Sequence, residues 1–141
     1  MVHALGEIHR VLKPGGILVD ARPDSRVLAF AERRTSRGFQ RFGLVRMARE
    51  AVGDDLVSDR AVAHVLREGL FKSRQRGRFW HRVPFDNLAD LRQYLAEHLR
   101  FAHRARWIVD LQTRRRYAND PFVIRRAVRY ELLEPLSPPP S

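Results

Sequence analysis

The chain has 141 residues and is 44% hydrophobic, which suffices for one core of ordinary domain size but not for two domains. It has no cysteine, which excludes a disulfide framework and a cysteine-based zinc site. The net charge of +11 favours nucleic acid or another anionic partner. Because 25 of the 27 basic residues are arginine, an Arg-rich codon usage is an alternative origin of that charge.

The N-terminal residues do not read as an export signal, and the sequence has no candidate membrane span. The opening MVHALGEIHR places Glu7 and two histidines where a signal peptide needs apolar residues, and no run approaches the roughly 18 apolar residues of a membrane span. We therefore expect a soluble, cytoplasmic protein without a membrane partner. The six histidines have no HExxH or HxxxH spacing, so no metal site is predicted.

The first elements are a helix and a strand. Apolar residues recur at helical spacing at Val2, Leu5, Ile8 and Leu12, and LKPGG (12–16) ends the helix. No Ser, Thr, Asp or Asn precedes the helix as a cap, so we expect sequence to be missing upstream. The apolar run 17–19 predicts a strand buried on both faces.

Residues 25–53 give weak signals of secondary structure, whereas the signals from Ser58 onward are clear. Residues 25–53 are an insert of uncertain structure, either a hairpin turning at 36–38, which we favour, or a helix capped by Ser25. Ser58 is expected to cap a helix that Gly69 ends. A strand follows over 71–85, with an arginine-rich face.

The last third alternates helix and strand. A helix starts at Asp86 or Asn87, with His98 on its buried stripe, and another helical piece is expected over 103–116. A final strand covers 122–132. We expect one domain over 1–134 and a disordered tail over 135–141.

Three segments resemble a known family. EIHRVLKPGGILVDARPD (7–24) resembles the region of the fifth strand in class I S-adenosylmethionine-dependent methyltransferases. HVLREGLFKSRQRGRFW (64–80) is similar to the helix and sixth strand of that family, and FVIRRAVRYELL (122–133) to its seventh strand. The resemblance implies an α/β, Rossmann-like fold that retains the last three strands in the order 5, 7, 6, with strand 7 antiparallel, and flanking helices.

The resemblance also implies S-adenosylmethionine as cofactor of a full-length parent that methylates a small molecule. The family's glycine-rich loop after the first strand and its acidic residue after the second have no counterpart here. Gly15 and Gly16 precede a strand, whereas a ligand-cradling loop follows one. We therefore expect a C-terminal fragment that is inactive and binds no cofactor alone.

The candidate substrate-binding residues are Asp20, Arg22 and Asp24. They cluster at the carboxyl end of the predicted strand 17–22, the edge where open α/β sheets bind ligands. An Arg–Asp pair that merely brackets a turn is an equal alternative. No catalytic residue is expected, because direct methyl displacement depends mainly on proximity and alignment.

Two other functions stay open. A small Arg-rich nucleic-acid-binding protein would use Trp80 and basic residues of 72–82, with the arginines at 114–116, 125, 126 and 129, although solvated strand and helix faces explain the same pattern. The open edge of strand 17–22 predicts self-association, or docking onto another chain.

Overall fold

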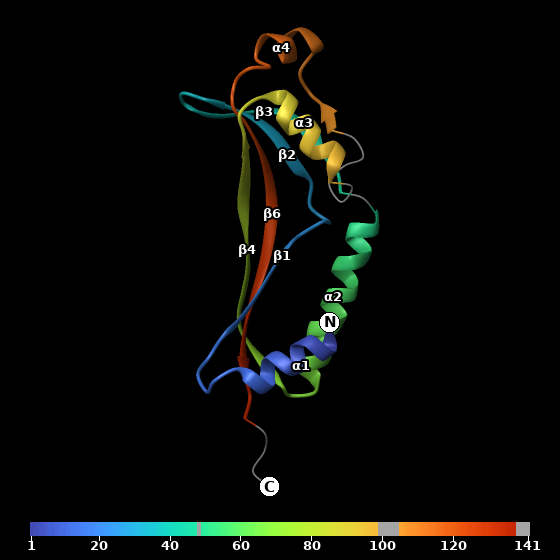
Figure 1. The fold of residues 1–141 in the computed structure, drawn as a ribbon, viewed down its shortest axis with the longest axis vertical. Coiled ribbons are helices and arrows are strands. Elements are labelled where there is room, and N and C mark those ends of the chain that lie inside the picture. The colour runs from blue at the N-terminus through green and yellow to red at the C-terminus, as the bar shows by residue number, and fades with distance from the viewer. Residues whose placement is uncertain (48, 99–104, 138–141) are drawn as a thin grey trace. The chain divides into compact units, whose positions relative to one another are not determined.

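The computed structural model describes residues 1–47, 49–98 and 105–137. Within these ranges the chain forms four helices and six strands, which confirms a mixed composition of α-helices and β-strands (Figure 1). The helices are α1 (Val2–Val11), α2 (Arg49–Arg67), α3 (Leu88–Glu97) and α4 (Leu111–Arg116). The strands are β1 (Leu18–Pro23), β2 (Ala29–Thr35), β3 (Gly38–Val45), β4 (Phe71–Phe85), β5 (Ala105–Trp107) and β6 (Phe122–Pro135).

All six strands belong to one open sheet. Its order is β1-β6-β2-β3-β5, and β4 also pairs with β6. The pairings of β2 with β3, of β2 with β6 and of β3 with β5 are antiparallel. This order differs from the predicted three-strand order, because β2, β3 and β5 come from segments to which the prediction gave no place in the sheet.

Contacts divide the chain into two compact units, each with its own core. The first contains the described residues of 1–22, 53–78 and 129–141, and the second contains those of 23–52 and 79–128. The core of the first unit combines α1, α2, β4 and β6. Its buried apolar residues are Leu5, Ala61, Val62, Val65, Phe71 and Leu133.

Helix α2 ends as predicted but begins earlier. Gly69 has a φ of +71°, and the N–H of Leu70 donates to the carbonyl of Val65, which closes the helix end. Ser58 lies inside α2, so the predicted start there is wrong. The earlier turns were missed because their apolar residues do not form a buried stripe, and Val57 is 61% exposed.

The core of the second unit lies between the β2–β3 hairpin, β6 and α3. Its largest buried members include Phe42, Leu91, Phe122 and Ile124. The hairpin predicted at 36–38 is confirmed, and Asn87 caps α3 by accepting from the N–H of Asp90. His98 is exposed and stacks on Tyr94, so its predicted place on the buried stripe is wrong.

Three further expectations need correction or restriction. Strand β1 alternates between half-buried and exposed residues, and Val19 is 58% exposed, so the strand is not buried on both faces.

Of the helix expected over 103–116, residues 105–107 form a strand and only 111–116 are helical, while 103 and 104 lie outside the described residues. The tail expected from 135 begins inside β6, and the N–H of Leu136 donates to the carbonyl of Leu70. Residues 138–141 lie outside the described ranges.

None of the helices in the described ranges has both the length and the apolar character that crossing a membrane requires.

Candidate functional site

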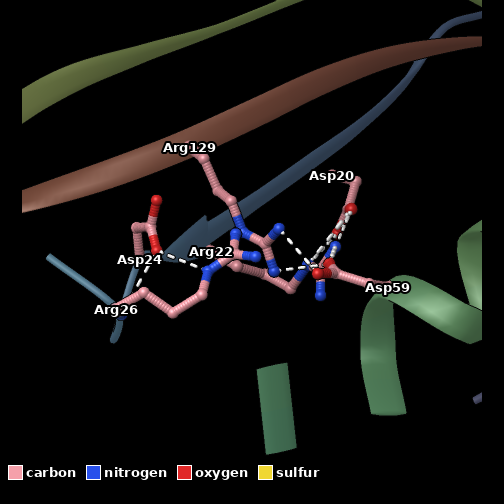
Figure 2. A network of polar contacts seen from close by, with 6 residues as sticks. All are labelled: Asp20, Arg22, Asp24, Arg26, Asp59 and Arg129. Atoms are coloured by element: carbon pink, nitrogen blue, oxygen red, sulfur yellow. Dashed lines mark hydrogen bonds and ion pairs between the residues drawn. The ribbon is translucent and has the colours of Figure 1, made fainter. Parts of the chain in front are cut away.

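Two of the three predicted site residues bind each other. Asp20 and Arg22 lie two residues apart on β1, so their side chains share one face of the strand. The Arg22 guanidinium donates to both Asp20 carboxylate oxygens, with its Nε at 3.0 and 3.1 Å and its Nη2 at 2.9 Å from Oδ2 (Figure 2). Both side chains are largely buried, with exposed fractions of 14% for Asp20 and 20% for Arg22. This is a charge-assisted, multiply hydrogen-bonded pair.

Asp59 of α2 joins this pair and links it to β6. Its carboxylate accepts from Arg22 Nη2 at 3.1 Å and from Arg129 Nη1 at 2.9 Å (Figure 2). We call Asp20, Arg22, Asp59 and Arg129 the Asp59 cluster. It contains two carboxylates and two guanidiniums, so its charges balance, and it joins β1, α2 and β6 in the first unit.

The ionised form of Asp59 is favoured by this environment. Burial on its own would raise the pKa, but the hydrogen bond and charge of Arg129, together with those of Arg22, outweigh it and hold the pKa of Asp59 below its ordinary value of 3.8. Asp59 is therefore ionised at neutral pH, and its contacts hold the end of β1 against α2 and β6.

Asp24 lies in the second unit and has a different role. It is only 2% exposed, and its Oδ1 accepts from the backbone N–H of Arg26 at 3.3 Å and from the Arg26 Nε at 3.2 Å (Figure 2). Its own N–H donates to the carbonyl of Ala127. Asp24 thus stabilises the turn after β1, which matches the structural alternative raised from the sequence; a contact of these three residues with substrate stays a prediction.

The glycines of LKPGG do not fit a cofactor cradle. Gly15 has a φ of +78°, and the N–H of Gly16 donates to the carbonyl of Lys13, so the pair forms the turn that follows α1. A cradle for the cofactor's charged groups would need a strand before the loop and a helix after it, and here the order is reversed.

A second candidate site lies on the outer face of the sheet in the second unit. Ala29 and Ala31 of β2 point into the core with Ile124 of β6, so the alternate residues of these strands point outward. Phe30 lies opposite Arg125 in the register. The residues that gather on this face are Phe30, Glu32 and Arg34 of β2, Phe39 and Arg41 of β3, Trp80 and Arg82 of β4, and Arg125 of β6. We call this set the aromatic–arginine face.

Its arginines stack on its aromatic rings. The guanidinium carbon of Arg41 is 3.9 Å from the ring centre of Phe30, and that of Arg82 is 4.2 Å from the ring centre of Phe39. Arg125 stacks against both Phe30 and Trp80, at 5.0 and 4.7 Å. These are cation–π distances, and they order long side chains that would otherwise be mobile on a surface.

Glu32 lies beneath these arginines. Its side chain is 7% exposed, and its Oε1 is 3.4 Å from Arg125 Nε and 3.8 Å from Arg82 Nε. One buried carboxylate thus orients two guanidiniums while four arginines share the face. The face keeps a positive charge, and Phe39 and Trp80 remain 42% and 41% exposed.

Most of the other basic residues singled out from the sequence have protein partners. Lys72 and Arg74 bind Glu134, and Arg76 lies 3.6 Å from Glu131. The Lys72 hydrogen bond, together with Arg74, lowers the pKa of Glu134 below 4.5 despite an opposing effect of burial. Arg114 stacks on Trp107 and Arg116 on Tyr117, and Arg129 belongs to the Asp59 cluster. Trp80, Arg82 and Arg125 of the predicted basic surface lie together on the aromatic–arginine face.

Within the described parts of the chain, no group of three or more His, Asp or Glu side chains is arranged to hold a metal ion. Comparison with protein families, with curated proteins and with solved structures finds no match to the chain.

Proposed function

We propose that this chain is the part of a class I methyltransferase domain that runs from the helix before the fifth strand to the seventh strand. The observation that supports the proposal is the pairing of β6 with both β1 and β4. In the family the seventh strand lies between the fifth and the sixth, and β1, β4 and β6 are the segments whose sequences resemble those three strands. The helices α1 and α2 also precede β1 and β4 as the resemblance implies.

The β2–β3 hairpin is the departure from that pattern. It lies between β1 and α2 in the chain, pairs with β6 through β2, and carries β5 on its other strand. Under the proposal it is an insertion that widens the sheet. Its place is consistent with segment 25–53 being the part that resembles nothing in the family.

Under the same proposal this part of the domain supplies scaffold rather than cofactor contacts. The Asp59 cluster fixes the carboxyl end of β1, where the family's ligands lie, and residues outside the printed sequence supply the glycine-rich loop. Methyl transfer by direct displacement needs aligned reactants more than a dedicated nucleophile. The 141-residue chain alone is therefore expected to be inactive, and the acceptor in the parent enzyme is a small molecule.

The coding sequence provides the simplest test. We expect the nucleotides ahead of the Met1 codon, translated in frame, to encode a strand, a glycine-rich loop and a helix, followed by an acidic residue at the end of the next strand. An upstream stop codon, or a frame without this loop, would contradict the proposal.

A further inference from the structure

We infer that the aromatic–arginine face is a binding surface for single-stranded nucleic acid. The inference is independent of the proposed methyltransferase origin, because it depends only on side chains of the second unit. It combines two features that single strands require on one face: exposed aromatic rings for the bases and ordered cations for the phosphates.

The aromatic part consists of rings that solvent still reaches. Phe39 and Trp80 are 42% and 41% exposed, and the ring of Trp80 is 5.8 Å from that of Phe30. Large aromatic side chains on the face of a sheet are normally covered by packing, so two exposed rings on one face indicate a surface that a ligand covers. Bases stack on such rings without sequence preference, because every base has an aromatic face.

The cationic part is already oriented. Stacking occupies the flat side of a guanidinium and leaves its N–H groups at the edge free to donate, so Arg41 and Arg82 can stack on Phe30 and Phe39 and still bind phosphate. Arg34 is exposed and lies opposite Phe39 in the register, which adds a further cation beside that ring. The buried Glu32 holds Arg82 and Arg125 in place without neutralising the face.

The same geometry favours single strands over duplexes. In a duplex the bases stack on one another and expose only their edges and the phosphates, so exposed rings gain nothing from them. The proposed ligand is a flexible strand whose bases can turn toward Phe39 and Trp80. A duplex would engage the arginines alone.

The test is fluorescence anisotropy with a labelled oligouridine of about 12 nucleotides, an oligothymidine of the same length and a matched DNA duplex. We expect the native chain to bind both single strands, more tightly than the duplex, with affinity falling from about 50 to 200 mM salt. Trp80→Ala is expected to weaken single-strand binding about tenfold, and Trp80→Phe to restore most of it. Arg41→Gln should lower the slope of log affinity against log salt by about 0.7.

Arg60→Gln is the matched control, because it removes the same charge from an exposed position on α2. We expect it to bind as the native chain does, and circular dichroism melts establish that each variant folds. Native-like binding by folded Trp80→Ala and Arg41→Gln variants would overturn the inference. Equal affinity for duplex and single strands, or no binding at 50 mM salt, would also overturn it.

Discussion

Asp59 is the residue on which the Asp59 cluster depends, because it accepts hydrogen bonds from both arginines of the cluster. Replacing it by asparagine leaves Arg22 and Arg129 largely buried without their shared counter-charge; their side chains are 20% and 21% exposed. We expect Asp59→Asn to lower the free energy of unfolding by about 2 kcal/mol at neutral pH, measured by urea denaturation. The same change at the exposed Asp86 is the control and should cost far less.

The pH dependence of that loss gives a second readout. Since the pKa of Asp59 in the folded chain lies below 3.8, its ion pairs stabilise the fold above that pH, and the stabilisation disappears as pH falls through the folded-state pKa. The difference in unfolding free energy between the native chain and Asp59→Asn should therefore shrink as the solution is acidified from about pH 5 to pH 2. A difference that stays constant over this range would show that the cluster does not act through the charge of Asp59.

The residues of this cluster differ in how far the sequence could predict them. Asp20 and Arg22 are two apart on one strand, so their pairing was foreseeable from spacing. Asp59 lies 37 residues beyond Arg22, and Arg129 lies a further 70 residues along the chain. No local sequence pattern predicts contacts between residues so far apart. On the aromatic–arginine face, Trp80 and Arg125 were foreseen, but Phe30, Phe39 and Arg41 lie in the hairpin whose register was not predicted.

Two glycines, one inside helix α2 and one just after its end, should respond in opposite ways to the same substitution. Gly69 adopts a φ of +71° at the helix end, where a side chain is strained even though a Cβ would meet no atom within 4 Å. Gly53 lies inside the helix, and a Cβ there would also meet no atom within 4 Å. At this position glycine is less favourable than alanine, because it has more conformational freedom to lose. We expect Gly69→Ala to lower the free energy of unfolding by about 1 kcal/mol and Gly53→Ala to raise it by about 0.5–1 kcal/mol.

Thermal and urea unfolding of the two variants check this pair of predictions. A Gly69→Ala variant as stable as the native chain would mean that α2 does not end through the left-handed glycine. A destabilised Gly53→Ala variant would mean that α2 does not extend back to Arg49.

At the scale of elements, the sequence predicted helix ends better than helix starts. Gly69 and Asn87 mark their boundaries through backbone conformation and capping, which are local effects. Ser58, a good capping residue by type, lies inside α2 and so does not mark the start of that helix. For strand β1 the sequence did not predict how many faces are covered. A run such as Ile17–Val19 is apolar whether one face of the strand is covered or both.

For the whole molecule, the free edge of β1 remains the feature most expected to drive self-association. β1 stands at the end of the strand order, and among the described strands it pairs with β6 alone. Ile17 and Val19 are 43% and 58% exposed. We expect the native chain to associate as its concentration rises, and Val19→Lys to reduce this, because charge on an edge strand opposes pairing. Light scattering coupled to size exclusion measures both.

Val57→Lys is the matched control, since Val57 is 61% exposed and belongs to helix α2 rather than to a strand. It should associate as the native chain does. A native chain that stays monomeric at high concentration, or equal effects of the two lysine variants, would contradict association through this edge.

The proposal that this chain is a methyltransferase segment without its cofactor-binding half is tested most directly by calorimetric titration with S-adenosylmethionine. Two proteins are compared: the 141-residue chain and the product of the same reading frame extended upstream. The account predicts saturable binding to the extended protein and none to the 141-residue chain. Saturable binding to the 141-residue chain alone would contradict it, and so would an extended protein that folds but does not bind the cofactor.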